Sequence, residues 1–232
     1  MKTLFVCGFD TLGYDTYQNL SYLENTDYFC YGTNDKMMDI EKRLYDEYLA
    51  GTYTRIIAHS LGCWLTTRLL PKLILTKKPI QVILMNPFIC NTWLTATLSI
   101  LPNWICSLCL VPKWIAINPS ALTYTVSGQI TSLNEWYATN LQQINYAGNR
   151  MNERLFINTY KTHNNITIIY GENDTIATIP KSFQGKLKTV SKFITIYSKH
   201  EPFQDDIAIQ HNLKNILIGI IPNLQVDSSN VL

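Results

Sequence analysis

Charged residues are scarce in this chain of 232 residues: they make up 16% of it, and the two signs nearly cancel to a net charge of +2. Because the lysines and arginines are scattered, the sequence shows no basic patch for nucleic acid. Long hydrophobic runs are also missing. The most apolar zone, residues 88–117, is interrupted by Pro102 and Pro112, so we expect no straight membrane-spanning helix. With 12% aromatic residues, the composition instead predicts a compact, soluble domain.

Cysteine is present without the pattern of a disulfide framework. The six cysteines lie mostly inside apolar runs, as buried free thiols do, which indicates a reducing compartment. Cys106 and Cys109 have C-x-x-C spacing, but no second pair or nearby histidine accompanies them, so we expect neither zinc nor another cofactor. The apolar start of the chain reaches Gly8 within one strand's length, which is too short for a signal peptide. We therefore expect a cytoplasmic location.

Short apolar segments alternate with helix-like patterns along much of the chain. The expected strands are residues 3–7, 27–31, 55–58, 81–85, 166–170 and 193–197. The expected helices are residues 16–24, 36–49, 61–71 (ending at Pro71) and 205–220. This alternation predicts an α/β fold, with a mostly parallel sheet of about six strands and helices on both faces.

Residues 53–70 hold the most informative motif. A β-branched run ends at Ala58, Ser60 follows, and an apolar helix pattern begins at once. This is close to the G-x-S-x-G nucleophile elbow, whose tight turn requires small residues two positions before and after the serine. Ala58 and Gly62 meet that requirement. Ser60 would stand at a helix N-terminus, which favours developing negative charge, although a plain N-cap serine would have the same local sequence.

A nucleophilic serine needs a base, and His200 is the expected one. It comes just after the last strand, where a parallel sheet presents its functional loops. The other three histidines fit less well. His59 adjoins Ser60, and neighbouring side chains at a tight turn point apart; His163 lies in a polar loop, and His211 lies in a helix pattern.

The acid that orients this base should follow the preceding strand. Gly171 ends that strand and Asp174 lies in the loop beyond it, with Glu172 as the competitor and a local turn or N-cap as the structural alternative for Asp174. The order Ser60, Asp174, His200 is the order found in α/β-hydrolases. Acyl transfer also needs donors to an oxyanion. We expect the backbone N–H groups of Leu61 and Phe9 to supply them.

The segment between residues 88 and 162 is too long for one crossover helix and too apolar for a linker. We expect a helical cap, or lid, at residues 89–162, inserted into a core of residues 1–88 and 163–232. The cap would carry an apolar substrate pocket, or a face that makes weak contact with a lipid interface. The expected pocket residues are Trp93, Trp104 and Trp114.

Four motifs together make the chain resemble the α/β-hydrolases over essentially its whole length. They are Cys-Gly-Phe-Asp (7–10), Ala-His-Ser-Leu-Gly (58–62), Gly-Glu-Asn-Asp (171–174) and Lys-His-Glu-Pro-Phe (199–203). Departures are Ala58 for the first elbow glycine and Cys7 where many members have histidine. The resemblance implies a serine esterase, lipase or thioesterase with a Ser60–His200–Asp174 triad and no metal or organic cofactor.

The substrate implied by this resemblance is a small-molecule or acyl-carrier-bound ester with an apolar acyl group. In size and layout the chain is similar to the small esterases that remove the methyl ester from pimeloyl–carrier protein. Fold alone does not choose the reaction, so a ligand-binding protein, an acyltransferase and a lyase stay open.

Overall fold

The computed structural model describes residues 1–8, 13–32, 35–76, 79–89, 143, 146–147 and 153–219. The predictions for Phe9, for Trp93, Trp104 and Trp114, and for most of the cap range 89–162 lie outside the described residues. Cys106 and Cys109 lie outside them too.

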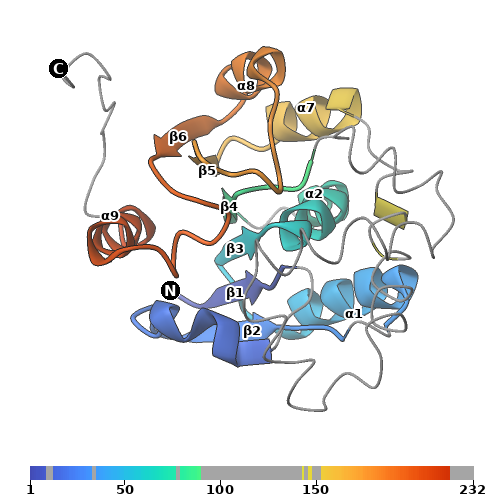
Figure 1. The fold of residues 1–232 in the computed structure, drawn as a ribbon. Coiled ribbons are helices and arrows are strands. Elements are labelled where there is room, and N and C mark those ends of the chain that lie inside the picture. The colour runs from blue at the N-terminus through green and yellow to red at the C-terminus, as the bar shows by residue number, and fades with distance from the viewer. Residues whose placement is uncertain are drawn as a thin grey trace, which may run out of the picture.

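Within the described residues, six strands form one sheet in the order β2-β1-β3-β4-β5-β6 (Figure 1). Every neighbouring pair is parallel, which confirms the predicted fold class. The strands are β1 (Thr3–Val6), β2 (Thr26–Phe29), β3 (Arg55–His59), β4 (Gln81–Met85), β5 (Ile166–Gly171) and β6 (Lys192–Ile196). Each lies within two residues of its predicted bounds. Because all strands run the same way, their carboxyl ends meet at one edge of the sheet.

Helices cover the sheet on both faces, as Figure 1 shows. They are the 3-10 helix η1 (Gly13–Leu20) and the α-helices α1 (Met37–Ala50), α2 (Leu61–Ile74), α7 (Glu153–Thr162), α8 (Lys181–Lys188) and α9 (Ile207–Leu217). Alternate strand side chains point to opposite faces, so the buried residues form two clusters. One cluster contains Ile56 and side chains of α1, α2, α7 and α8. The other contains Ile57 and side chains of η1 and α9.

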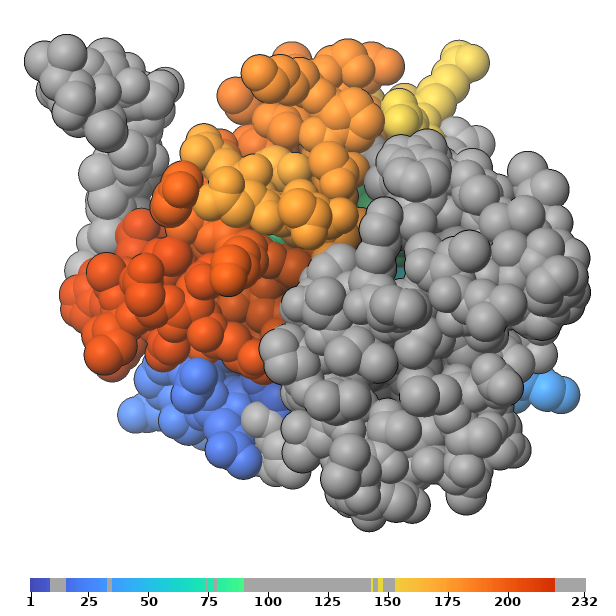
Figure 2. All heavy atoms as spheres, viewed as in Figure 1, coloured from blue at the N-terminus to red at the C-terminus, as the bar shows by residue number. Residues whose placement is uncertain are grey.

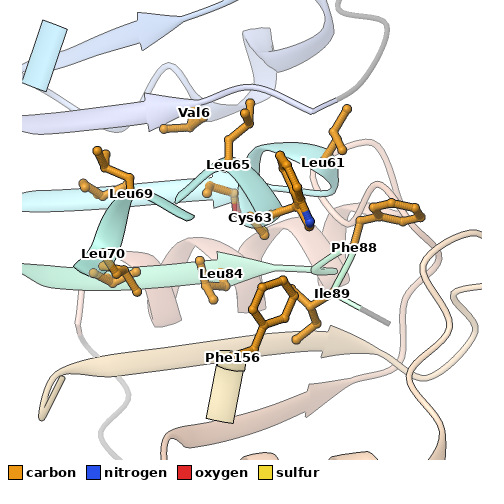
Figure 3. Packing of buried hydrophobic residues seen from close by; sticks show 14 of the residues in the cluster. Val6, Leu61, Cys63, Leu65, Leu69, Leu70, Leu84, Phe88, Ile89 and Phe156 are labelled. Carbon is orange, nitrogen blue, oxygen red and sulfur yellow. Dashed lines mark hydrogen bonds between the residues drawn. The ribbon is translucent and has the colours of Figure 1, made fainter. Parts of the chain in front are cut away.

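Helix α2 begins directly after Ser60, so the packing of this helix fixes the position of that residue. Figure 3 shows Leu61, Leu65 and Leu69 along this helix, with Val6 of β1 above them in the view and Leu84 of β4 below; all five belong to one buried cluster. These side chains are almost fully buried, and burying one leucine stabilises the fold by about 1.5–3 kcal/mol. The N-terminus of α2 is therefore fixed against the carboxyl edge of the sheet.

The predicted end of this helix at Pro71 is wrong. The helix runs through Pro71 to Ile74. Proline removes one backbone hydrogen bond, but Leu70 and Leu73 on either side of it are buried in the core, and their burial keeps this turn helical. The helix expected at residues 16–24 is the shorter 3-10 helix η1, in which Tyr17 departs from helical geometry.

Helix α7 lies at the end of the range assigned to the cap, and it packs on the core. Its Phe156 and Tyr160 are buried in the same cluster as α2, and the Tyr160 hydroxyl is 2.8 Å from Thr67 Oγ1. Helix α8 is the crossover between β5 and β6. Across the described part of the chain, no helix is both long and apolar enough to span a lipid bilayer.

Segments from the two ends of the described chain lie side by side. Figure 2 shows the C-terminal part of the described chain, in orange-red, directly against the N-terminal part, in blue. The Asn19 side chain donates a hydrogen bond to the Phe203 carbonyl at 2.9 Å, and the ring of Phe203 lies 5.0 Å from that of Tyr17. This contact packs the loop after β6 against η1.

Candidate active site

Ser60 occupies the sharp turn between β3 and α2. Its φ of 51° and ψ of −120° are unusual for a residue with a side chain and mark local strain. The turn is held by backbone hydrogen bonds: the Ser60 N–H donates to the Met85 carbonyl, and its own carbonyl accepts from the N–H groups of Cys63 and Phe88. The Ser60 side chain makes no N-capping hydrogen bond to α2, so the interpretation as a plain helix cap does not describe it.

The small residues around Ser60 have a steric cause. A Cβ atom on Gly62 would lie 2.4 Å from the carbonyl oxygens of both Val6 and Cys7, at the end of β1. Ala58 is completely buried in the sheet. Gly8, just beyond β1, also passes close to the turn, because a Cβ there would lie 3.2 Å from the Ser60 Cβ. The backbone at Gly8 therefore lies directly beside the serine.

The structure brings Ser60, His200 and Asp174 together at the carboxyl edge of the sheet. His200 Nε2 lies 2.9 Å from Ser60 Oγ, and His200 Nδ1 lies 2.8 Å from Asp174 Oδ2. Asp174 is buried, and its other oxygen accepts hydrogen bonds from the N–H groups of Ile176 and Ala177 at 2.8 and 2.9 Å. Its competitor Glu172 is exposed. The three groups form one continuous relay.

The charge of Asp174 determines which ring nitrogen of His200 carries the proton. Burial alone would raise its pKa, but the charge and hydrogen bond of His200, together with the two backbone N–H donors, lower the pKa below its usual 3.8. An ionised carboxylate only accepts hydrogen bonds, so His200 Nδ1 must donate to it. In neutral His200 this leaves Nε2 without a proton, ready to accept the hydroxyl proton of Ser60.

His59 belongs to a second hydrogen-bond chain rather than serving as a base for Ser60. Its Nε2 lies 2.9 Å from the His200 carbonyl oxygen, which can only accept, so Nε2 carries the proton. Its Nδ1 then accepts from the Tyr17 hydroxyl at 3.2 Å, and the Tyr17 oxygen accepts from the Gly8 N–H at 2.7 Å. These hydrogen bonds join the backbone of Gly8, just after β1, to the backbone of His200.

The side chain of Asn86 makes a further set of hydrogen bonds that hold the site together. It follows β4 with a φ of 43°, and its side chain is buried. The amide nitrogen donates to the carbonyls of Lys199 and His200 at 2.9 and 2.7 Å, while the amide oxygen accepts from the Gly171 N–H at 2.6 Å. Asn86 therefore ties together the loops that hold Asp174 and His200. In the sequence, this residue signals only the end of a strand.

Acid should weaken the fold through His59. Burial, and then the neighbouring His200 charge, lower the His59 pKa from 6.5 to about 3. The unfolded chain binds a proton here below pH 6.5 and the folded protein only near pH 3, so stability falls as the pH drops between these values. From pH 6.5 to about pH 4.5 we expect a loss of about 2–3 kcal/mol, measured by urea unfolding. Asp174, with its pKa lowered from 3.8, loses its contribution only below that range.

The matched variants for this prediction are His59→Gln and His211→Gln. His211 is exposed on α9, so its replacement should leave the pH dependence unchanged. The His59→Gln variant should show a flatter dependence of unfolding free energy on pH. An unaltered slope in that variant would contradict the assignment.

Of the two expected oxyanion donors, Leu61 lies within the described residues and Phe9 does not. Leu61 is the first residue of α2, where backbone N–H groups have no partner within the helix, and it directly follows Ser60. Phe9 lies outside the described residues, and the neighbouring Gly8 N–H is already bonded to Tyr17. In the described part of the chain, no group of three or more histidine, cysteine, aspartate or glutamate side chains could hold a metal ion.

Solved structures with a similar fold are known. A monoacylglycerol lipase from Paleococcus ferrophilus is 15% identical, with 94% of this chain and 93% of that one covered and a TM-score of 0.59. A haloalkane dehalogenase from Bradyrhizobium elkani is 14% identical, with 94% and 90% covered and a TM-score of 0.64. A thermophilic esterase from Thermogutta terrifontis is 9% identical, with 95% and 90% covered and a TM-score of 0.60.

No protein-family model matches this sequence, and no curated protein matches it either. The likeness to solved structures, which include a protein described as an α/β-hydrolase enzyme from a deep-sea metagenome, nevertheless extends over nearly the whole chain. The chain has the α/β-hydrolase fold, as the four motifs led us to expect.

Proposed function

We propose that this protein is a serine-dependent hydrolase of carboxylic esters or thioesters. The observation that carries the proposal is the relay from Ser60 Oγ through His200 to the buried Asp174, with contacts of 2.9 and 2.8 Å. A strained serine at a helix N-terminus, hydrogen-bonded to a base that an acid orients, is the arrangement used for nucleophilic acyl transfer. The similar lipase and esterase structures support the same class of reaction.

The mechanism follows from the proton positions. His200 Nε2 takes the Ser60 hydroxyl proton as Oγ attacks the carbonyl carbon, and the Leu61 N–H stabilises the oxyanion, with Phe9 as the proposed second donor. The imidazolium then gives its proton to the leaving alcohol or thiol, which leaves an acyl group on Ser60. Water attacks this acyl-enzyme while His200 removes its proton, and Asp174 holds the imidazole orientation in both halves.

Two features of the chain support a more specific class of substrate. The apolar sequence of residues 88–117 favours an apolar acyl group, and the proposed pocket residues are Trp93, Trp104 and Trp114. The compact layout supports a carrier-bound substrate such as the methyl ester of pimeloyl–carrier protein. A dehalogenase on this fold would need a carboxylate nucleophile at position 60, where this chain has serine.

Ester turnover combined with labelling by a fluorophosphonate tests this proposal. We expect hydrolysis of p-nitrophenyl esters from acetate to laurate, and one covalent adduct located by mass in the tryptic peptide 56–68, which contains Ser60. Protein unfolded in urea is the control, and it should not react because His200 is no longer beside Ser60. Failure of both turnover and labelling in the folded protein would favour a ligand-binding protein. Turnover with the adduct elsewhere would contradict Ser60 as the nucleophile.

A further inference from the structure

Two cysteines meet at the carboxyl ends of neighbouring strands. Cys7 and Cys30 each come directly after the last paired residues of β1 and β2, which are Val6 and Phe29. The parallel ladder continues to them, because the Cys7 N–H donates to the Phe29 carbonyl at 3.1 Å. Side chains in the same register on neighbouring strands point to the same face, and the two sulfur atoms lie 2.6 Å apart.

This backbone geometry suits a disulfide bond. Neighbouring strands are about 4.8 Å apart, within the range of about 4.4–6.8 Å that Cα atoms of disulfide-bonded cysteines adopt. The sulfur separation of 2.6 Å compares with about 2.05 Å in the bond itself. Forming the bond therefore requires only a small side-chain movement.

The two thiols have different environments. Cys7 is completely buried, and burial raises its thiol pKa, whereas Cys30 is partly exposed. A hydrogen bond from the Cys7 thiol lowers the pKa of Cys30 by stabilising its thiolate. Cys30 is thus the accessible, more reactive sulfur, and Cys7 is a resolving thiol held beside it.

We propose that Cys7 and Cys30 are a modification site that forms a reversible disulfide bond when the protein meets a peroxide. The Cys30 thiolate attacks one peroxide oxygen and the O–O bond breaks, giving a sulfenic acid and, with a proton, water. The Cys7 sulfur then attacks the Cys30 sulfur. The S–O bond breaks, and the hydroxide leaves with the Cys7 proton as a second water. One peroxide is reduced and two thiols are oxidised.

The site is separate from the proposed hydrolase chemistry but adjoins it. Cys7 is followed by Gly8, whose N–H begins the hydrogen-bond chain through Tyr17 and His59. The bond would tie the end of β1, and with it Gly8 beside Ser60, to the end of β2. Its formation does not depend on whether Ser60 hydrolyses esters.

The test is a mass measurement on the full-length protein, reduced and then exposed to hydrogen peroxide. Trypsin releases residues 3–36 as one peptide, which contains Cys7 and Cys30 and no other cysteine. After unfolding and alkylation, we expect this peptide to carry no alkyl group and to have lost two hydrogen atoms. Dithiothreitol should restore both alkylation sites, and oxidation should raise the unfolding temperature of the protein by several degrees.

Three variants sharpen the result. Cys30→Ser should leave Cys7 reduced and alkylated after peroxide, whereas Cys7→Ser should accumulate a Cys30 sulfenic acid that dimedone traps. Cys63→Ser is the matched control, because Cys63 is buried on the other face, where its thiol donates to the Ala58 carbonyl at 3.2 Å, and the bond should form as in the wild type.

Three results would overturn the proposal. The first is a peptide 3–36 that stays fully alkylated, and the second is oxidation at Cys30 without a bond to Cys7. The third is a bond that forms as fast in urea-unfolded protein, since the folded strand register would then have no part in it. Both readouts are independent of ester turnover, so a protein without hydrolase activity could still form the bond.

Discussion

Replacing Ser60 with alanine is expected to lower kcat for p-nitrophenyl ester hydrolysis by about a million-fold, to the small residual rate that substrate binding and oxyanion stabilisation alone supply. The change removes the Ser60 hydroxyl, the proposed proton donor to His200 Nε2, which lies 2.9 Å away. It adds no bulk, and the backbone bonds that hold the turn do not involve the side chain, so the fold should persist. Initial rates and far-ultraviolet circular dichroism measure the two effects.

The matched control is Ser191→Ala. Ser191 also has a bonded hydroxyl, which donates to the Leu187 carbonyl, but it lies at the beginning of β6, at the opposite edge of the sheet. Its replacement should leave kcat within about two-fold of the wild type. A folded Ser60→Ala protein that retained wild-type activity would contradict the proposed nucleophile.

Replacing Asp174 with asparagine should lower kcat by about 10⁴-fold, the loss seen for this change in a serine protease triad. The carboxylate accepts a hydrogen bond from His200 Nδ1 at 2.8 Å. Its other oxygen is bonded to two backbone N–H groups, so an asparagine would keep its carbonyl oxygen there and turn its NH₂ group toward His200. Nδ1 would then have to accept, Nε2 would carry the proton, and the imidazole could no longer deprotonate Ser60.

Steady-state kinetics at neutral pH measure this loss, with Glu172→Gln as the control. Glu172 lies two residues away in the same loop and is exposed, so its replacement should change kcat little. The opposite pattern, with activity lost on replacing Glu172 and retained on replacing Asp174, would show that Glu172 and not Asp174 is the acid.

Much of the architecture could be predicted because its causes are local. Buried parallel strands need short β-branched and apolar runs, and each of the six runs chosen from the sequence is a strand. The positions of Ser60, Asp174 and His200 follow from one further rule, that parallel strands present functional loops at their carboxyl ends. The contacts among these three residues are consistent with that expectation.

The supporting residues could not be predicted because their partners are distant in the sequence. Tyr17 contacts His59, 42 residues away, and Asn86 contacts the His200 carbonyl, 114 residues away. Neither has a local motif, since a tyrosine in a short helix and an Asn-Pro after a strand are ordinary sequences. The predicted helix end at Pro71 was wrong for a related reason. The burial that keeps this turn helical comes from tertiary packing, which outweighs a local helix breaker.

The three proposed catalytic groups come from the loops after β3, β5 and β6, and their hydrogen bonds join residues 140 and 26 positions apart. Such long-range contacts form late, because each requires a large chain loop to close first. Reactivity at Ser60 would therefore report complete assembly of the sheet rather than collapse of the chain. A fluorophosphonate added at intervals after dilution from denaturant would count the molecules that have reached the native topology, and so time its last docking step.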